Sequence, residues 1–110
     1  MKAIYISHPF TKDERVNTYK AQLIAAGLSE DYPNILFVNP INAMRHLRDT
    51  ELSYEVILGQ CIELMKRCDA VIMVGNWRDS IGCMKEYQNA KAAGMTVYNG
   101  IAEFKKSMKR

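Results

Sequence analysis

The chain has few of the features that mark membrane, secreted or metal-binding proteins. None of its apolar runs approaches the roughly 20 residues that a membrane-spanning helix needs. The apolar stretch at residues 3–6 is short and is soon interrupted by polar residues and a proline, unlike a signal peptide. We therefore expect no membrane partner and a location in the cytoplasm.

Cysteine is also scarce, with only Cys61, Cys68 and Cys83 in the chain. They form no CxxC pair and have no metal-ligand spacing with the two histidines, so we expect no metal and no cofactor. Their apolar helical surroundings are typical of reduced core cysteines. The sequence also lacks the GxGxxG, GxxxxGK[ST] and nucleophile-elbow patterns, which disfavours dinucleotide binding, P-loop hydrolysis and α/β-hydrolase chemistry.

What is present is the composition of an ordinary globular domain. The 110 residues are 48% hydrophobic and 25% charged, and no linker, repeat or low-complexity stretch divides them, so residues 1–110 are interpreted as one domain. The net charge of +3 only weakly favours an anionic ligand, because four of the positive charges crowd the last six residues.

Short β-rich runs alternate with longer helical patterns along the chain. Strands are expected at residues 3–7, 35–38, 70–75 and 96–98. The first helix is expected to begin at Thr11, with Glu14 at capping-box spacing, and to end at Gly27. Its apolar face is expected to contain Val16, Tyr19, Leu23 and Ala26.

The later helices follow the same alternation. After an irregular segment that reaches about residue 49, a second helix carries the stripe Ile57, Cys61, Leu64 and Cys68. A third helix follows residue 82, and a final amphipathic turn or two lies at residues 101–108. Strands separated by helices predict an α/β fold with a parallel sheet of about four to five strands and helices on both faces.

Glu86 lies inside an apolar helical stripe. Cys83, Tyr87, Ala90 and Gly94 share one helical face, and Glu86 falls on that face. A buried carboxylate is retained only if it is paired, protonated or used in chemistry. Gly82, one turn earlier, is expected to leave open space beside it. The alternative interpretation is a surface glutamate that reaches solvent or forms a salt bridge.

Three segments follow strand ends, at residues 7–11, 39–42 and 76–82. Ligands of open α/β sheets bind beyond the carboxyl ends of the strands, and helix N-termini there favour phosphate. Thr11, Asp79 and Ser80 are equally interpretable as helix caps, Trp77 as a residue packed on its own helix, and His8 as a bystander. The candidate binding residues are Ser7, His8, Pro9, Phe10, Asn39, Asn42, Trp77, Asp79, Ser80 and Gly82.

Three of these stretches carry a resemblance to a known family. Residues 5–11 (YISHPFT), 68–74 (CDAVIMV) and 80–82 (SIG), with Glu86 and Ala90 after them, resemble the nucleoside 2-deoxyribosyltransferase-like superfamily. The similarity is nearest to the DUF4406 domain family and covers about residues 3–98. It implies a flavodoxin-like or Rossmann-like fold. It also implies cleavage of the N-glycosidic bond of a deoxynucleoside or deoxynucleotide, with the sugar passed to another base or to water.

The resemblance also implies roles for individual residues. Glu86 corresponds to the family's nucleophile, and Tyr5 to a tyrosine that orients it. Ser80 corresponds to a serine that contacts phosphate in nucleoside 5'-monophosphate hydrolases, which favours hydrolysis of a nucleotide over transfer. Cys61 stands where the family usually has an aspartate that assists proton transfer, and His8 stands where relatives often have glycine.

The sequence thus predicts an N-glycosidase that acts on a (deoxy)nucleoside 5'-monophosphate. One alternative is a non-catalytic nucleotide-binding or sensing module, which the absence of an acid at Cys61 supports. Another is an accessory protein for nucleic acid that uses the basic tail with Arg45 and Arg48, although we expect a nucleic-acid partner less than a small molecule. The resemblance also implies a homodimer or higher oligomer, in which the segment around Asn99 reaches a neighbouring chain's site.

Overall fold

A four-stranded parallel sheet organises the computed structural model, which describes residues 1–109. The strands are β1 (Lys2–Ser7), β2 (Ile35–Val38), β3 (Ala70–Met73) and β4 (Thr96–Tyr98), in the order β2-β1-β3-β4. All three strand pairs are parallel, with Lys2 opposite Ile35 and Ile4 opposite Ala70. This is the α/β, flavodoxin-like arrangement that the alternation predicts, although β3 ends two residues earlier than expected.

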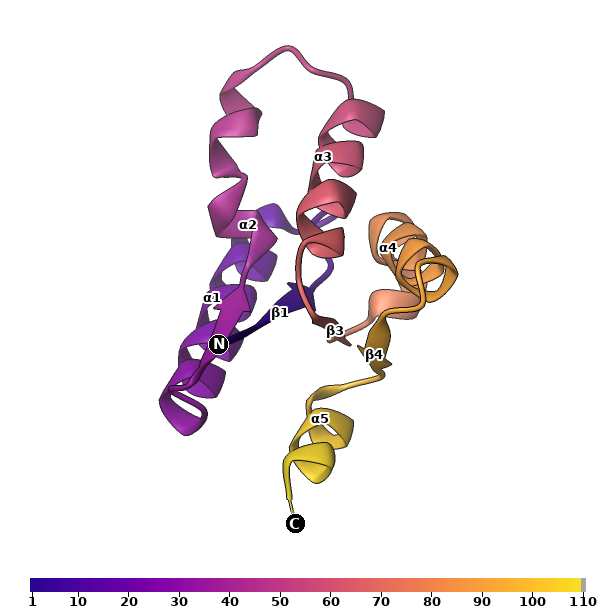
Figure 1. Ribbon diagram of the computed structural model, residues 1–110. Coiled ribbons are helices and arrows are strands. Elements are labelled where there is room, and N and C mark those ends of the chain that lie inside the picture. Colours follow the sequence, from indigo (N-terminus) through magenta and orange to yellow (C-terminus); the bar gives the residue numbers. More distant parts are fainter. Residues whose placement is uncertain (110) are drawn as a thin grey trace.

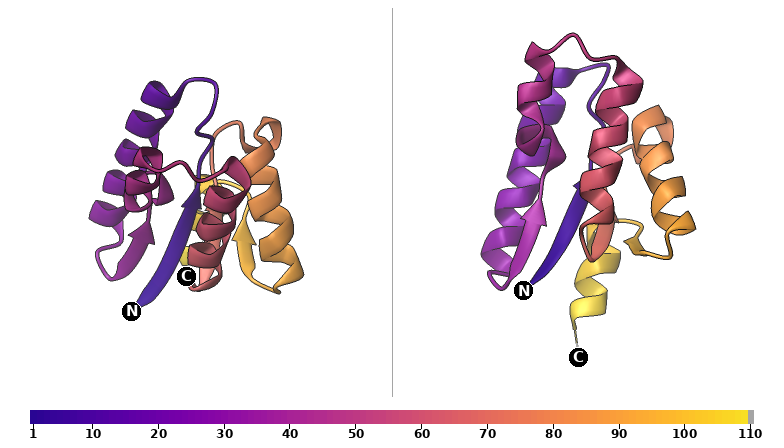
Figure 2. Two further views of the ribbon diagram at one scale, coloured as in Figure 1. Left: turned by 90° about the horizontal axis from the view of Figure 1, so that it is seen from above. Right: turned by 45° about the horizontal axis from the view of Figure 1, so that its top comes forward.

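Helices cover both faces of the sheet (Figures 1 and 2). The α-helices are α1 (Glu14–Asp31), α2 (Pro40–Ala43), α3 (Tyr54–Lys66), α4 (Ile81–Ala92) and α5 (Ile101–Met108), and the 3₁₀ helices are η1 (Arg45–Asp49) and η2 (Trp77–Asp79). Leu28 of α1 and Phe104 of α5 pack on one face of the sheet. Met65 of α3 and Ala90 of α4 pack on the other.

Strand alternation sorts the core into these two layers. On β1, Ile4 and Ile6 face the α1 and α5 layer, whereas Tyr5 faces the α3 and α4 layer. On β3, Ile72 and Val71 divide in the same way. Because both faces are covered, β3 is apolar and buried along its whole length, and β1 is buried from Ile4 to Ser7.

The first helix differs from its prediction at both ends. It begins at Glu14 rather than Thr11, because the Asp13 side chain accepts a hydrogen bond from the Val16 amide and caps it. It continues through Gly27 as far as Asp31. The apolar face that the sequence predicts for this helix is exposed. It consists of Val16, Tyr19, Leu23 and Ala26.

The packed face of α1 is formed instead by Ala21, Ile24, Ala25 and Leu28. The prediction was wrong because α1 is apolar on two sides, so helical spacing alone does not decide which side meets the sheet.

The segment between β2 and α3 is more regular than expected. The Asn39 side chain caps α2, and η1 follows directly after it. The α3 helix ends at Lys66, so Cys68 of the predicted stripe lies beyond it. Figure 1 shows this segment rising past the carboxyl ends of the strands and returning through α3, so it overhangs the edge where ligands of such sheets bind.

The strand order also defines where that edge opens. Chain order leads from β1 out to β2 on one side, whereas β3 and β4 lie on the other side. The carboxyl ends of β1 and β3 therefore flank a topological switch point, the usual position of a ligand crevice. Among residues 1–109, no helix combines the length and the apolar character that a membrane crossing requires.

Candidate functional site

A cavity of about 240 Å³ opens at the switch point, under the segment between β2 and α3. We call it the apolar cavity. It is close to the lower end of the size range of ligand pockets, about 300 Å³. The side chains that line it are Tyr5, His8, Phe10, Thr11, Glu14, Pro40, Ile41, Met44, Arg45, Leu47, Arg48, Tyr54, Ile57, Leu58, Cys61, Ser80, Cys83 and Glu86, together with the backbone of Gly82.

Glu86 is the buried carboxylate of this cavity, only 6% exposed. It lies on the inner face of α4 with Cys83 and Ala90, as the helical spacing predicts. The Tyr5 hydroxyl donates a hydrogen bond to Oε2, and the Ser7 hydroxyl donates one to Oε1 over 2.8 Å. Tyr5 and Ser7 reach the same carboxylate because residues i and i+2 of a strand point to the same face.

Two opposing effects act on the Glu86 carboxyl. Burial raises its pKa from the ordinary value of 4.5, because a low-dielectric environment penalises the charged form. The hydrogen bonds from Tyr5 and Ser7 act in the opposite direction, since both donate to the carboxylate. The pKa of Tyr5 itself is raised well above 10.0, first by burial and then by the charge of Glu86. Tyr5 therefore stays protonated and remains a donor.

The space beside Gly82 is not open, contrary to expectation. A Cβ atom on Gly82 would lie 2.9 Å from the Tyr54 hydroxyl oxygen, which rests against the backbone of α4 at this point. Tyr54 belongs to the first turn of α3, so the close approach joins the N-terminal ends of two helices. Glycine at this position leaves room for the phenol, which any larger residue would displace.

Cys61 lines the apolar cavity at the position where the resemblance leads one to expect an acid. Burial raises the pKa of its thiol to about 11, and the negative charge of Glu86 acts in the same direction. The thiol is therefore protonated at neutral pH, and an S–H group is a weak hydrogen-bond donor. Cys61 thus places no carboxyl group at the position where the resemblance implies one.

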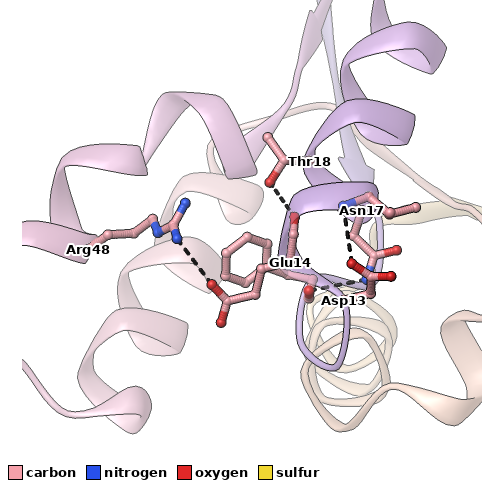
Figure 3. A network of polar contacts seen from close by, with 7 residues as sticks. Asp13, Glu14, Asn17, Thr18 and Arg48 are labelled. Atoms are coloured by element: carbon pink, nitrogen blue, oxygen red, sulfur yellow. Dashed lines mark hydrogen bonds and ion pairs between the residues drawn. The ribbon is translucent and has the colours of Figure 1, made fainter.

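An ion pair stands at the rim of the apolar cavity. Arg48 Nη2 lies 3.1 Å from Glu14 Oε1, and the Arg48 guanidinium lies 5.5 Å from the centre of the Phe10 ring. Figure 3 shows the Arg48 side chain extending from η1 towards Glu14 at the start of α1. Both side chains of the pair are about half exposed, so the pair contributes little stability.

A second cavity of about 330 Å³, which we call the polar cavity, shares its wall with the first. It lies between the loop after β1, the start of α1 and the segment after β3. Its lining contains two lysines and many hydrogen-bonding groups, and these residues are His8, Pro9, Thr11, Lys12, Asp13, Asn17, Lys20, Gly75, Asn76, Asp79 and Ser80.

Three side chains, His8, Thr11 and Ser80, line both cavities. The Ser80 hydroxyl oxygen caps α4 by accepting a hydrogen bond from the Cys83 amide over 3.2 Å. Its hydrogen stays free to donate to a ligand, so the cap and a ligand contact are compatible. Burial lowers the pKa of His8 from 6.5, and the charge of Lys20 acts in the same direction, so the imidazole is neutral at neutral pH.

Several candidate residues are not brought to the apolar cavity. Trp77 is only 5% exposed and packs against Tyr87, with ring centres 4.9 Å apart, and it lines neither cavity. Asn42 is exposed on α2. Asn39 caps α2 through Oδ1, and its Nδ2 is buried without a hydrogen-bond partner. Pro9 and Asp79 line only the polar cavity.

No group of three or more His, Cys, Asp or Glu side chains in the described part of the chain is arranged to hold a metal ion. The apolar cavity contains one buried carboxylate with two hydroxyl donors and a nearby phenol. A carboxylate in this position can act as a nucleophile or as a base.

Reasoning from the sequence missed Tyr54 and the lining that η1 and α2 provide. The signal for Tyr54 was available, because residues 54, 57, 58 and 61 fall on one face of α3. Lys12 and Lys20 had no such signal, since they reach the polar cavity through the conformation of the loop after β1 and the packing of α1.

One family model matches this chain, over residues 2–99, and it is described as a domain of unknown function, DUF4406. None of the curated proteins and none of the solved structures matches the chain significantly.

Proposed function

The chain belongs to the DUF4406 family, and from that premise we propose that it is an N-glycosidase that cleaves a (deoxy)nucleoside 5'-monophosphate. The observation that carries the proposal is the buried carboxylate of Glu86, held by hydroxyl donors on both oxygens inside a cavity at the switch point. A family of unknown function sets no substrate, so the argument rests on the chemistry of the site. The resemblance to the nucleoside 2-deoxyribosyltransferase-like superfamily is compatible with it.

Each of the two cavities binds a different part of the substrate. The sugar lies over Glu86, and the base enters the apolar cavity, whose walls include Ile41, Leu47 and Leu58. The 5'-phosphate lies towards Ser80 and the polar cavity, where Lys12 and Lys20 supply positive charge. The N-terminus of α4 favours an anion at the same place.

The reaction follows the pattern of retaining glycosidases. An oxygen of Glu86 bonds to the anomeric carbon as the bond to the base nitrogen breaks, and the electron pair of that bond leaves with the base. Water then attacks the anomeric carbon and releases the carboxylate. Tyr5 and Ser7 orient the carboxylate, and each of its oxygens keeps a free lone pair for the attack.

The first test is base release, measured by liquid chromatography, from deoxyribo- and ribonucleoside 5'-monophosphates and from the unphosphorylated nucleosides. We expect release that requires the 5'-phosphate and that falls on the order of 10⁴-fold in Glu86→Gln, because the amide is not nucleophilic. Glu63→Gln is the matched control, since Glu63 is an exposed carboxylate paired with Arg67.

A binding-only module is the second candidate, and the neutral thiol of Cys61 favours it. It predicts tight nucleotide binding by the folded protein with no base release from any member of the panel. Release from nucleosides but not from nucleotides would contradict the assignment of the polar cavity to phosphate.

We further propose that the protein acts in the cytoplasm as a homodimer or larger oligomer. The exposed apolar side chains of α1, Val16, Tyr19 and Leu23, support self-association.

A further inference from the structure

Tyr54 occupies a place beside the nucleophile that depends on the glycine at position 82. Ser53 caps α3 through a 3.2 Å hydrogen bond from the Val56 amide, which fixes the turn that carries Tyr54. The Tyr54 hydroxyl then lies where a side chain at residue 82 would begin, 2.9 Å from the Cβ position. The phenol is held against the backbone of α4 and lines the apolar cavity.

The Tyr54 side chain is 45% exposed, and its hydroxyl makes no hydrogen bond to another residue of the described chain, so it is accessible to a ligand. Its pKa is raised, first by burial and then by the charge of Glu86, so the phenol stays protonated at neutral pH. A free donor therefore points into the same cavity as the carboxylate.

The Tyr54 hydroxyl and Glu86 meet the same side of α4. Gly82 precedes Glu86 by four residues, so the two positions share one side of the helix, about one turn apart. The hydroxyl lies against Gly82, and both Tyr54 and Glu86 line the apolar cavity. On α3, Tyr54 lies seven residues before Cys61, so both fall on the face that lines the cavity. Tyr54 thus offers an O–H group from the same helix, and a phenol is a stronger hydrogen-bond donor than the Cys61 thiol.

We propose that Tyr54 is the general acid of the cleavage, donating its hydroxyl proton to the departing base. As the Glu86 oxygen bonds to the anomeric carbon, the glycosidic electron pair moves onto the base nitrogen, which takes the proton from Tyr54. The phenolate then accepts a proton from the attacking water, which restores both groups. This inference rests on the proposed N-glycosidase activity.

The test is Tyr54→Phe on two substrates that differ only in their need for an acid. One is the nucleotide that the wild type cleaves. The other is its activated form, N7-methylated for a purine or 5-fluorinated for a pyrimidine, whose base leaves with little or no protonation. We expect kcat on the ordinary substrate to fall about 100-fold or more, with KM little changed, and kcat on the activated substrate to fall far less.

Tyr32→Phe is the matched control, because Tyr32 packs against Phe104 on the opposite face of the sheet and lines neither cavity. Equal losses on the two substrates would mean that Tyr54 only shapes the cavity, and no loss on either would mean that its hydroxyl is idle. Either result overturns the inference while the proposed function stands. Base release by neither the wild type nor any variant would overturn the proposed function and this inference with it.

Discussion

Glu86 must be ionised to act as a nucleophile, but the ionised form lowers the stability of the fold. Burial penalises the ionised carboxylate, and the hydroxyls of Tyr5 and Ser7 offset only part of that penalty, so the pKa remains raised. Below the pKa that Glu86 has in the unfolded chain, the carboxyl is protonated in both the folded and the unfolded state. Its contribution to the stability of the fold is then fully present. That contribution is lost as the pH rises through the raised folded pKa. At neutral pH, ionised Glu86 therefore destabilises the fold.

Glu86→Gln should accordingly stabilise the protein at neutral pH. We expect the free energy of unfolding to rise by about 1 kcal/mol at pH 7, which raises Tm by about 4 °C or more for a domain of this size. The gain should shrink as the pH falls through the raised pKa of Glu86, below which the carboxyl is protonated. Thermal unfolding between pH 4 and pH 8 measures both effects.

Glu63→Gln should show no such pH-dependent gain, because both side chains of its pair with Arg67 are exposed. A lower Tm of Glu86→Gln at pH 7 would show that the hydrogen bonds of the carboxylate outweigh its desolvation.

At the scale of elements, the first turn of α4 contributes to the helix cap, to the lining of the cavities and to the packing of Tyr54. Ser80 caps the helix and lines both cavities, Gly82 accommodates Tyr54, and Glu86 follows one turn later. Gly82 weakens the helix locally, since glycine is unfavourable there compared with alanine. The sequence keeps a poor helix former where the phenol of another helix needs room.

Gly82→Ala should separate helix stability from activity. The new Cβ would be too close only to the movable end of Tyr54, and it would make an ordinary contact with Leu58, so we expect the free energy of unfolding to be unchanged or to rise by up to about 1 kcal/mol. The phenol is displaced, however, so base release should fall in a steady-state assay. The double variant with Tyr54→Phe should lose no more activity than Tyr54→Phe alone, because both changes remove the same group.

Gly59→Ala provides the comparison, because a Cβ on Gly59 of α3 has nothing within 4 Å. It should gain helix stability without losing activity. Full activity in Gly82→Ala would show that the position of the phenol does not matter.

At the scale of the whole molecule, the outer side of α1 exposes a stripe of apolar side chains. Val16, Tyr19 and Leu23 are 42%, 64% and 53% exposed, and their spacing places them along one side of α1. We expect a dimer or larger oligomer by light scattering, and Leu23→Glu should reduce the measured mass towards that of the monomer. Leu36→Glu, at an equally exposed leucine on β2, is the control. A monomeric wild type would refute the proposed assembly.

The sequence by itself determined the periodic and local features of this protein. Alternation of apolar strands and amphipathic helices predicted the parallel sheet, and a carboxylate within the apolar stripe of α4 predicted that Glu86 is buried. Strand parity placed Tyr5 and Ser7 on one face, although Ser7 was expected to bind substrate and instead donates to Glu86. These features depend on neighbours within a few residues, which a linear pattern records.

Only the tertiary structure decided which distant residues complete the site. The approach of Tyr54 to Gly82, the overhang of η1 above the cavity and the arrival of Lys20 at the polar cavity depend on how separate elements pack. The same holds for α1, which is apolar on two sides. Packing against the sheet buries the side that contains Leu28 and leaves Leu23 exposed. Packing of this kind depends on the shape of the whole interior, because a side chain's partners are set by the fold rather than by its distance along the chain.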